Sequence, residues 1–168
     1  MISGKTCLVG LVGQPVRHSI SPVIQNAAFA EMGLDWCYLT FPCDKKHLSN
    51  ALKSLLTLEC RGLNITIPHK KNVTSLCAEL SPLAKRLRAV NTLIPNKTGG
   101  WEGTNTDVEG FLAPLKKEKV DWKGRKAMVL GSGGSARAAI AGLHSLGFSE
   151  VTIIGRKKES LINLEMDL

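Results

Sequence analysis

The feature that most constrains the fold is a glycine-rich turn that joins a predicted strand to a predicted helix in the second half of the chain. Residues 126–130 have the apolar character of a buried strand, residues 131–135 read Gly-Ser-Gly-Gly-Ser, and an alanine-rich helix is predicted over 136–146. A second strand is predicted over 151–154. A strand, helix and strand in this order form a β-α-β unit with two parallel strands, so we predict an α/β fold.

The glycine turn also predicts a ligand. Gly131-x-Gly133-x-x-Ala136 matches the dinucleotide fingerprint in the form that ends in alanine. The first glycine permits the turn, the second lets the backbone approach a pyrophosphate, and the small third residue lets the helix pack on the strand. A plain structural turn is the alternative, but the position between a strand and a helix favours nucleotide binding by Gly131, Gly133, Gly134 and Ser135.

The residues after the second strand predict which nucleotide binds. A cofactor without a 2′-phosphate usually meets an acidic residue there, whereas this chain has Gly155, Arg156 and Lys157. A guanidinium on a 2′-phosphate forms charge-assisted hydrogen bonds of about 1.5–3 kcal/mol, which is enough to select NADP over NAD. The alternative is an exposed basic loop.

Composition excludes several classes of function. The 168 residues are 43% hydrophobic and 21% charged, as in a globular protein, and no apolar run approaches the roughly 20 residues of a membrane span. The first residues lack the pattern of a secretory signal, so we expect a cytoplasmic protein with no membrane partner. The five cysteines include no C-x-x-C pair, which argues against a disulfide framework and against a metal site.

The positive charge favours small anionic ligands. The formal net charge of +8 comes from lysine pairs spread along the chain and not from one basic arm. Aromatic residues make up only 5%, so a nucleic-acid partner is the weaker alternative.

The first hundred residues alternate predicted strands and helices. Strands are predicted over 6–12, 36–42, 62–67, 90–95 and 101–104. Helices are predicted from Pro22 with Ser21 as the cap, after Asp44 as the cap, and from Ser81-Pro82, with a further helical stretch before the last. We therefore expect one α/β unit over 1–105 and a second over 106–168, in which helices at 106–118 and 159–168 flank the β-α-β segment.

The predicted strand 62–67 carries polar groups on one face. Asn64 and Thr66 alternate with Ile65 and Ile67, and Pro68 ends the strand because it lacks an amide hydrogen. Lys70 follows directly, where its ammonium is positioned to carry a proton beside the polar pair. The alternative is an ordinary polar strand face followed by a surface lysine.

Taken together, the motifs of the chain resemble those of the shikimate dehydrogenase family. The resemblance rests on His18-Ser19-Ile20-Ser21-Pro22, on Asn64 to Lys70, on Ala89-Val90-Asn91-Thr92, on Gly103-Thr104-Asn105-Thr106-Asp107, and on the glycine turn with Arg156. These runs occur in the family's order and at its spacing over nearly the whole chain. The resemblance implies an N-terminal α/β substrate-binding domain followed by the first part of a Rossmann-type NADP-binding domain.

It also implies an activity, the reversible reduction of 3-dehydroshikimate to shikimate by NADPH, and roles for single residues. Ser19, Ser21 and Thr66 are implied as hydroxyl donors to the substrate carboxylate, Asn64, Asn91 and Asp107 as partners of its ring hydroxyls, and Lys70 with Asp107 as the catalytic pair. Each has a plainer alternative: Ser21 and Asp107 as helix caps, Ser19 as a turn residue, and Asn91 as a strand-end amide.

The chain also departs from the family. Gln25, Arg88 and Gly155 stand where histidine, glycine and asparagine are common, and family members continue beyond the length of this chain. We expect the 168-residue chain alone to be inactive or nearly so, and its open sheet edge to favour self-association as a homodimer. A quinate/shikimate dehydrogenase and a non-catalytic shikimate-binding chain remain the alternatives.

Overall fold

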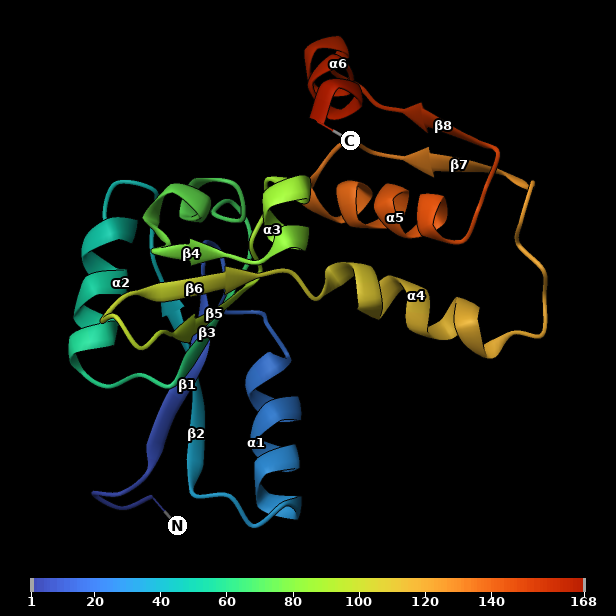
Figure 1. Cartoon of the computed structure of the whole chain (residues 1–168). Helices are drawn as coiled ribbons and strands as arrows, with labels where there is room; N and C mark the ends of the chain where they lie inside the picture. The colour runs from blue at the N-terminus through green and yellow to red at the C-terminus, as the bar shows by residue number, and fades with distance from the viewer. Residues whose placement is uncertain (1, 168) are drawn as a thin grey trace.

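A computed structural model describes residues 2–167, which form two separate sheets flanked by helices (Figure 1). The strands are β1 (Cys7–Gly13), β2 (Trp36–Pro42), β3 (Gly62–Ile65), β4 (Glu79–Leu80), β5 (Thr92–Pro95), β6 (Trp101–Thr104), β7 (Lys126–Leu130) and β8 (Glu150–Ile154). The helices are α1 (Ser21–Glu31), α2 (Leu48–Thr57), the 3-10 helix η1 (Asn72–Leu76), α3 (Pro82–Leu87), α4 (Asp107–Lys117), α5 (Gly134–Ser145) and α6 (Lys158–Asp167). The predicted α/β fold is confirmed.

The first sheet is mixed, with six strands in the order β2-β1-β3-β5-β6-β4. β1 pairs in parallel with both β2 and β3, whereas β5 runs antiparallel to β3 and β6. Helices α1 and α2 lie on opposite sides of this sheet (Figure 1). Leu48, Leu52 and Leu55 of α2 are buried against one face, as their helical spacing predicts.

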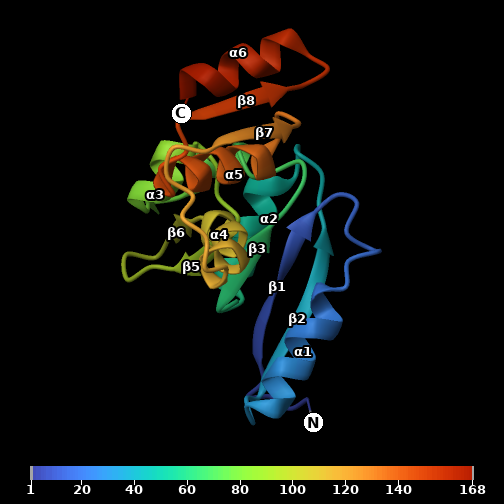
Figure 2. The same cartoon turned by 90° about the vertical axis from the view of Figure 1, so that its right-hand side faces the viewer.

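The residues of β1 and β2 divide between the two faces of the sheet, and the cluster that contains Tyr38 lies on the α1 side. Alternate residues of a strand face opposite sides, so Val9 and Leu11 of β1 pack with Tyr38 of β2 in one cluster, while Val12 packs in the cluster of α2. Figure 2 shows β1, β2 and α1 side by side.

The strand that carries Asn64 is shorter than predicted. β3 ends at Ile65, and Ile67 is 71% exposed instead of sharing the buried face of Ile65. The chain turns here, because the His69 amide donates to the Thr66 carbonyl at 2.9 Å. The short strand β4 was not predicted, since two residues are too few to produce an alternating pattern.

Two predicted helix caps are wrong. Ser21 is the first residue of α1 and not its cap: Ile20 precedes the helix and makes no side-chain capping bond. Helix α2 begins at Leu48, later than predicted, and Asp44 instead accepts a hydrogen bond from the His47 amide in the preceding turn at 2.9 Å. Ser81 is confirmed as the cap of α3, where it accepts from the Ala84 amide at 3.2 Å.

The second sheet contains the predicted β-α-β unit. β7 and β8 pair in parallel, and α5 joins them. Helix α5 begins two residues earlier than predicted, at Gly134, because the end of the glycine turn already has helical backbone. Helices α4 and α5 pack closely at Gly142, where a Cβ atom would come within 2.9 Å of the Phe111 ring. The opposite face of the β7-β8 pair exposes Met128, Leu130 and Ile154.

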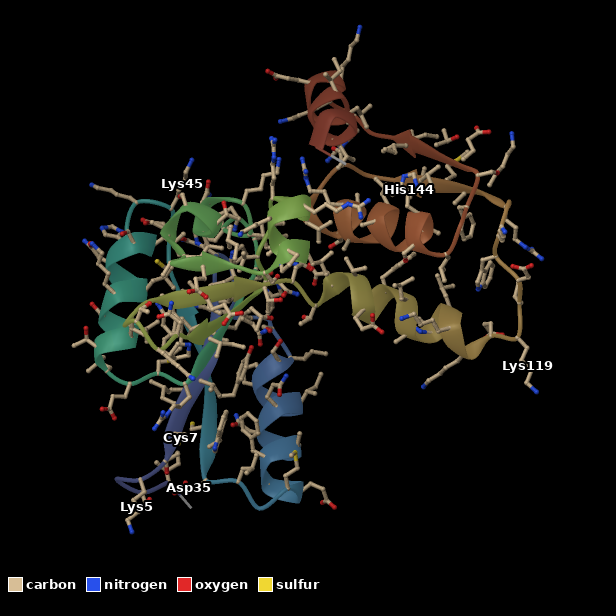
Figure 3. All side chains as sticks on the ribbon, in the orientation of Figure 1. Lys5, Cys7, Asp35, Lys45, Lys119 and His144 are labelled. Atoms are coloured by element: carbon tan, nitrogen blue, oxygen red, sulfur yellow. The ribbon has the colours of Figure 1, made fainter. Side chains whose placement is uncertain are left out.

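Charges are spread over the surface. Lys5, Lys45 and Lys119, which Figure 3 labels, lie exposed on widely separated parts of the molecule. None of the helices within residues 2–167 combines the length and apolar character of a membrane span. In the same described part of the chain, no group of three or more His, Cys, Asp or Glu side chains is arranged to hold a metal ion.

Candidate active site

The centre of the site is an ion pair between two residues that lie far apart in the sequence. Lys70 Nζ donates to Asp107 Oδ2 at 2.6 Å, and the two side chains are only 19% and 25% exposed. Lys70 comes from the loop after β3, and Asp107 is the first residue of α4. Thr106 holds the cap position before α4, and Asp107 is the first residue inside the helix. The Asp107 carboxylate therefore does not act as the cap and instead forms the ion pair.

The loop of Lys70 is fixed at both sides. His69 is fully buried, and its Nε2 lies 2.7 Å from the Cys43 carbonyl oxygen. The Lys70 carbonyl accepts a hydrogen bond from the Val90 amide at 2.8 Å. These contacts tie the lysine backbone to the end of β2 and to the segment before β5, so the ammonium has a defined position relative to the sheet.

Asn91 connects β5 to the carboxylate of the ion pair. Its Oδ1 accepts from the Thr92 hydroxyl at 2.9 Å and from the Thr106 amide at 3.0 Å. Its Nδ2 donates to Asp107 Oδ1 at 2.7 Å and to Thr106 Oγ1 at 3.1 Å. Asn91 is therefore more than a strand-end amide, because it holds the carboxylate oxygen that Lys70 leaves free.

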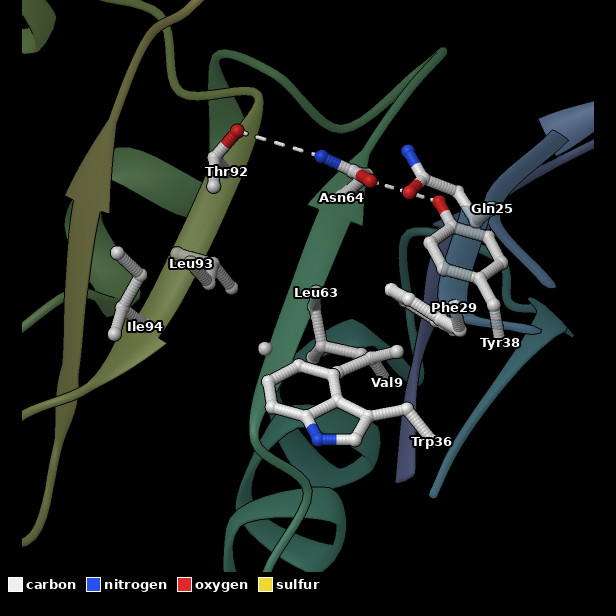
Figure 4. A pocket seen from close by; sticks show the side chains of 12 residues that line it. Val9, Gln25, Phe29, Trp36, Tyr38, Leu63, Asn64, Thr92, Leu93 and Ile94 are labelled. Carbon is white, nitrogen blue, oxygen red and sulfur yellow. Dashed lines mark hydrogen bonds between the residues drawn. The ribbon is translucent and has the colours of Figure 1, made fainter. Parts of the chain in front are cut away.

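Asn64 lies on β3 beside this group and is held by a tyrosine (Figure 4). The Tyr38 hydroxyl donates to Asn64 Oδ1 at 2.8 Å, and Asn64 Nδ2 lies 3.4 Å from Thr92 Oγ1. Burial raises the pKa of Tyr38 to about 12, although a hydrogen bond with Ser21 lowers it in part. These residues lie beside a cavity of about 240 Å³, which Gln25 of α1 also lines.

The three remaining predicted hydroxyls belong to the segments that follow β1 and β3. Ser19 Oγ donates to Ser21 Oγ at 3.1 Å and also accepts from the Ser21 amide at 3.2 Å. Both serines are half-buried at the start of α1, and Ser21 reaches the Tyr38 hydroxyl. Thr66 follows β3, with its amide bonded to the Val12 carbonyl at 3.0 Å and its side chain half-buried.

The glycine turn forms a second hollow, with a volume of about 570 Å³. Its walls are formed by Leu130, Gly131, Ser132, Gly133, Ile154, Gly155, Arg156 and Lys157. Gly131 has φ +127°, a conformation that side-chain-bearing residues rarely adopt, so the turn needs glycine there. Gly134 and Ser135 form the first turn of α5 instead of the wall, and Arg156 and Lys157 are exposed at the rim.

The glycine turn and the ion pair lie next to each other. A Cβ atom on Gly134 would be 3.3 Å from Cδ of Lys70, so the start of α5 touches the stem of the lysine side chain. The buried Arg137 of α5 donates to the Leu87 carbonyl at the end of α3 at 3.4 Å, a contact between the two parts of the chain. The amine, the carboxylate and a predicted phosphate-binding helix end thus meet in one place.

This arrangement has a definite chemical capacity. An ammonium group held by a carboxylate can stabilise negative charge that develops on a carbonyl oxygen and can deliver a proton to it. The neighbouring amides and hydroxyls can hydrogen-bond a small molecule with several hydroxyl groups. Together with the helix end beside Lys70, the site suits a reaction between such a molecule and a phosphate-bearing cofactor.

Some residues of the site were not predicted. Thr92 and Thr106 lie within sequence runs that indicated the site, and Ser132 lies within the glycine turn, so position in a motif was an available signal. Tyr38 had no such signal, because its strand reads as an ordinary alternating one and only the sheet brings its hydroxyl to Asn64.

Comparisons with known proteins find shikimate dehydrogenases. The protein-family model described as the shikimate dehydrogenase substrate binding domain matches residues 11–93 of this chain. A shikimate dehydrogenase (NADP(+)) of Prochlorococcus marinus strain MIT 9301 is 51% identical over 164 residues, which are 98% of this chain and 57% of that protein.

Two solved structures are similar over the whole fold. The crystal structure of shikimate dehydrogenase from Aquifex aeolicus has a TM-score of 0.94 at 38% identity, covering 100% of this chain and 62% of that one. The shikimate 5-dehydrogenase of Listeria monocytogenes, solved with shikimate and NAD, has a TM-score of 0.89 at 36% identity, covering 99% of this chain and 57% of that one. The chain thus spans less than two thirds of the length of each of these proteins.

Proposed function

We propose that the site of this chain serves the reversible NADPH-dependent reduction of 3-dehydroshikimate to shikimate, because the chain is similar over nearly its whole length to shikimate dehydrogenases. The reaction is a step of chorismate and aromatic amino acid biosynthesis, and its enzyme is an NADP-dependent oxidoreductase acting on a CH–OH group. The observation that carries the proposal is the 2.6 Å pair of Lys70 and Asp107 beside the start of α5.

We assign the proton transfer to Lys70. NADPH, when bound, would supply a hydride to the ketone carbon, and negative charge would build on the ketone oxygen. The Lys70 ammonium stabilises this charge and gives the oxygen its proton, and in the reverse direction the amine takes the proton from the hydroxyl. Asp107 keeps the ammonium in place through Oδ2, while Asn91 holds Oδ1 at 2.7 Å.

We assign the remaining polar groups to substrate binding. We propose that the substrate carboxylate accepts hydrogen bonds from the hydroxyls of Ser19, Ser21 and Thr66. These half-buried hydroxyls can each give a charge-assisted hydrogen bond. Asn64, Asn91 and Asp107 are proposed to meet the ring hydroxyls. Asn91 already uses both of its amide hydrogens within the protein, so its contribution is mainly to hold Asp107.

The hollow at the glycine turn fits NADP. The backbone of Gly131, Gly133 and the first turn of α5, with Gly134 and Ser135, can receive the pyrophosphate, because the helix end has free amide donors. Gly155, Arg156 and Lys157 line the far side of this hollow, where two cationic side chains suit a 2′-phosphate.

We place the boundary between the substrate-binding part and the cofactor-binding part at residues 105 and 106, which the separation of the two sheets supports. We further propose a cytoplasmic protein whose partner is a small molecule and neither nucleic acid nor a membrane. The exposed apolar face of β7 and β8 supports association into a homodimer, which light scattering of the purified chain tests.

Calorimetry on the 168-residue chain tests the proposed function. Shikimate should bind, and Asp107→Ala should weaken its binding at least tenfold, since a hydrogen bond to a charged group contributes about 1.5–3 kcal/mol. Lys46→Ala, which removes an exposed charge on another part of the surface, should bind like the parent chain. Absence of shikimate binding by a folded chain would contradict the proposal.

A quinate/shikimate dehydrogenase that uses NAD is the second candidate, because one structural neighbour was solved with NAD. Titrating the chain with shikimate and quinate, and separately with NADP⁺ and NAD⁺, distinguishes the two. Preference for shikimate and NADP⁺ supports the first assignment, and equal binding of both substrates and both cofactors supports the second.

A further inference from the structure

Hydrogen bonds run in one direction through the proposed substrate site, and two of the side chains in this path have no role in the proposed function. The path starts at Tyr38 of β2, which donates to Asn64 of β3. It continues through Thr92 to Asn91 and ends on the Asp107 carboxylate. Tyr38 and Thr92 are the two links without an assigned role.

The first link fixes the orientation of the Asn64 amide. The Asn91 carbonyl can only accept, so the amide atom 3.5 Å from it is Nδ2, and the atom that accepts from the Tyr38 hydroxyl at 2.8 Å is Oδ1. The amide nitrogen therefore points away from Tyr38. Its two contacts, with Thr92 Oγ1 and the Asn91 carbonyl, measure 3.4 and 3.5 Å, which is longer than usual for an N–H···O bond. This nitrogen is free to form a shorter bond to a ligand hydroxyl.

The second link fixes the Asn91 amide in the same way. The Thr106 backbone amide can only donate, so the atom 3.0 Å away is the Asn91 oxygen. The Thr92 hydroxyl donates to the same oxygen at 2.9 Å, which leaves the nitrogen of Asn91 to face Asp107. The bond from Thr92 to Asn91 and the bond from Asn91 to Asp107 run in the same direction, so the first polarises the second.

We propose that Tyr38 and Thr92 are positioning residues of the shikimate site: Tyr38 orients the Asn64 amide so that its nitrogen faces the ligand, and Thr92 orients the Asn91 amide so that its nitrogen faces Asp107. The inference rests on the proposed function for the identity of the ligand. It commits Asn64 to recognise a ligand oxygen as a hydrogen-bond donor. Tyr38 is well placed for this role, because it is 4% exposed and its ring is packed with Val9 and Leu11.

Two near-isosteric substitutions test the inference in the 168-residue chain. Tyr38→Phe and Thr92→Val each remove one donating hydroxyl and keep nearly the same volume. Each should weaken shikimate binding about threefold to tenfold, the loss expected for one net hydrogen bond. Thr57→Val on α2, which removes a hydroxyl far from the site, is the matched control and should bind shikimate within twofold of the parent chain.

The side-chain NH₂ signals of Asn64 and Asn91 in nitrogen-15 NMR spectra report the orientation of these amides directly. A substitution that affects only the stability of the fold would leave these two signals unchanged. Tyr38→Phe should shift and broaden the Asn64 NH₂ signals, and Thr92→Val should do the same for Asn91, while most backbone signals keep their positions. Shikimate added to the parent chain should shift the Asn64 NH₂ signals as well. Unmoved NH₂ signals in both variants, or unchanged shikimate affinity in both variants, would overturn the inference.

The outcomes separate this inference from the proposed function. If the parent chain fails to bind shikimate, the proposed function fails, and the role of Tyr38 and Thr92 in orienting the amides is then decided by the NH₂ signals alone. If the parent chain binds shikimate and both variants bind it equally well, the proposed function stands and the positioning role is wrong.

Discussion

The two halves of the proposed site achieve their geometry in different ways. On the first sheet, side chains hold one another: Lys70, Asp107 and Asn91 are joined by bonds of 2.6 and 2.7 Å and are largely shielded from solvent. At the second sheet, the backbone of the glycine turn forms the hollow, and the charged side chains at its rim are exposed. The first half is therefore organised by contacts within the protein, whereas the side chains at the rim of the second half are exposed to solvent.

The same difference appears in the packing. The first sheet is covered by α2 on one face and by α1 on the other, and Leu52, Leu63 and Ile65 are each only 2% exposed. The second sheet is covered by α5 on one face, while the other leaves Leu130 78% exposed. Substitutions in the two halves should therefore have very different consequences.

The largest effect is expected at the ion pair. In a version extended to the length of the curated relatives, Lys70→Ala should lower kcat about 100- to 10,000-fold, the usual range for loss of a general acid, while shikimate affinity changes little. Steady-state assays of NADPH formation measure kcat and KM. Lys46→Ala, with the same loss of charge, should keep full turnover, and unchanged turnover of Lys70→Ala would reduce Lys70 to a binding residue.

Core substitutions compare the stability of the two sheets directly. Leu52→Ala should lower the free energy of unfolding by about 2–5 kcal/mol, because it opens a cavity beneath the first sheet. Met128→Ala on the exposed face of β7 should change it by less than about 0.5 kcal/mol. Urea denaturation followed by circular dichroism measures both. Similar losses for the two variants would show that the face of β7 is covered in solution.

Cofactor selection should depend on the exposed rim. Arg156→Ala should weaken NADPH binding roughly 10- to 100-fold and leave NADH binding nearly unchanged, since the guanidinium is proposed to meet only the 2′-phosphate. Fluorescence titration with the two cofactors measures the difference. Arg61→Ala, another exposed arginine, controls for loss of charge, and equal losses for NADPH and NADH would remove the NADP assignment.

The smallest expected effect is a gain in stability on the first sheet. Helix α2 ends with the Cys60 amide bonded to the Leu55 carbonyl and the Glu59 amide bonded to Leu56, a pattern that places Glu59 at φ +57°. Glycine is favoured at this position, so Glu59→Gly should raise the free energy of unfolding by about 0.5–1 kcal/mol. Glu59→Ala, which keeps a Cβ atom, should give no such gain in thermal denaturation.

Much of the fold follows from local patterns in the sequence. The limits of β2, β6 and β7 agree with prediction to the residue, because alternating or apolar runs between turn residues define short strands. Arg88 is instructive: it lies at φ +48°, which explains why glycine is common there in the family that the chain resembles. The errors occur where the chain turns, as at Ile67 and Ser21. Hydrogen bonds between residues two or three apart form there, from the His69 amide to Thr66 and from the Ser21 amide to Ser19, in place of the predicted strand and cap.

The candidate site divides in the same way. Each motif identified its own polar residues, and the sequence predicted that Lys70 and Asp107 work together through the family resemblance. Tyr38 could not be assigned in this way, because its importance depends on which partner the sheet brings to its hydroxyl group. Thr92 lies within a motif, but its bond to Asn91 was visible only in the structure.

The order of strands and helices, the need for glycine at position 131 and the presence of a basic pair after β8 were determined by the sequence alone, because each depends on local conformation or residue type. The tertiary structure decided the 2.6 Å ion pair between Lys70 and Asp107, which are 37 residues apart, and the contact of Gly134 with the Lys70 side chain. It also decided the direction of the hydrogen bonds from Tyr38 to Asp107. Hydrogen bonds between distant residues depend on strand order and helix packing, which no local pattern specifies.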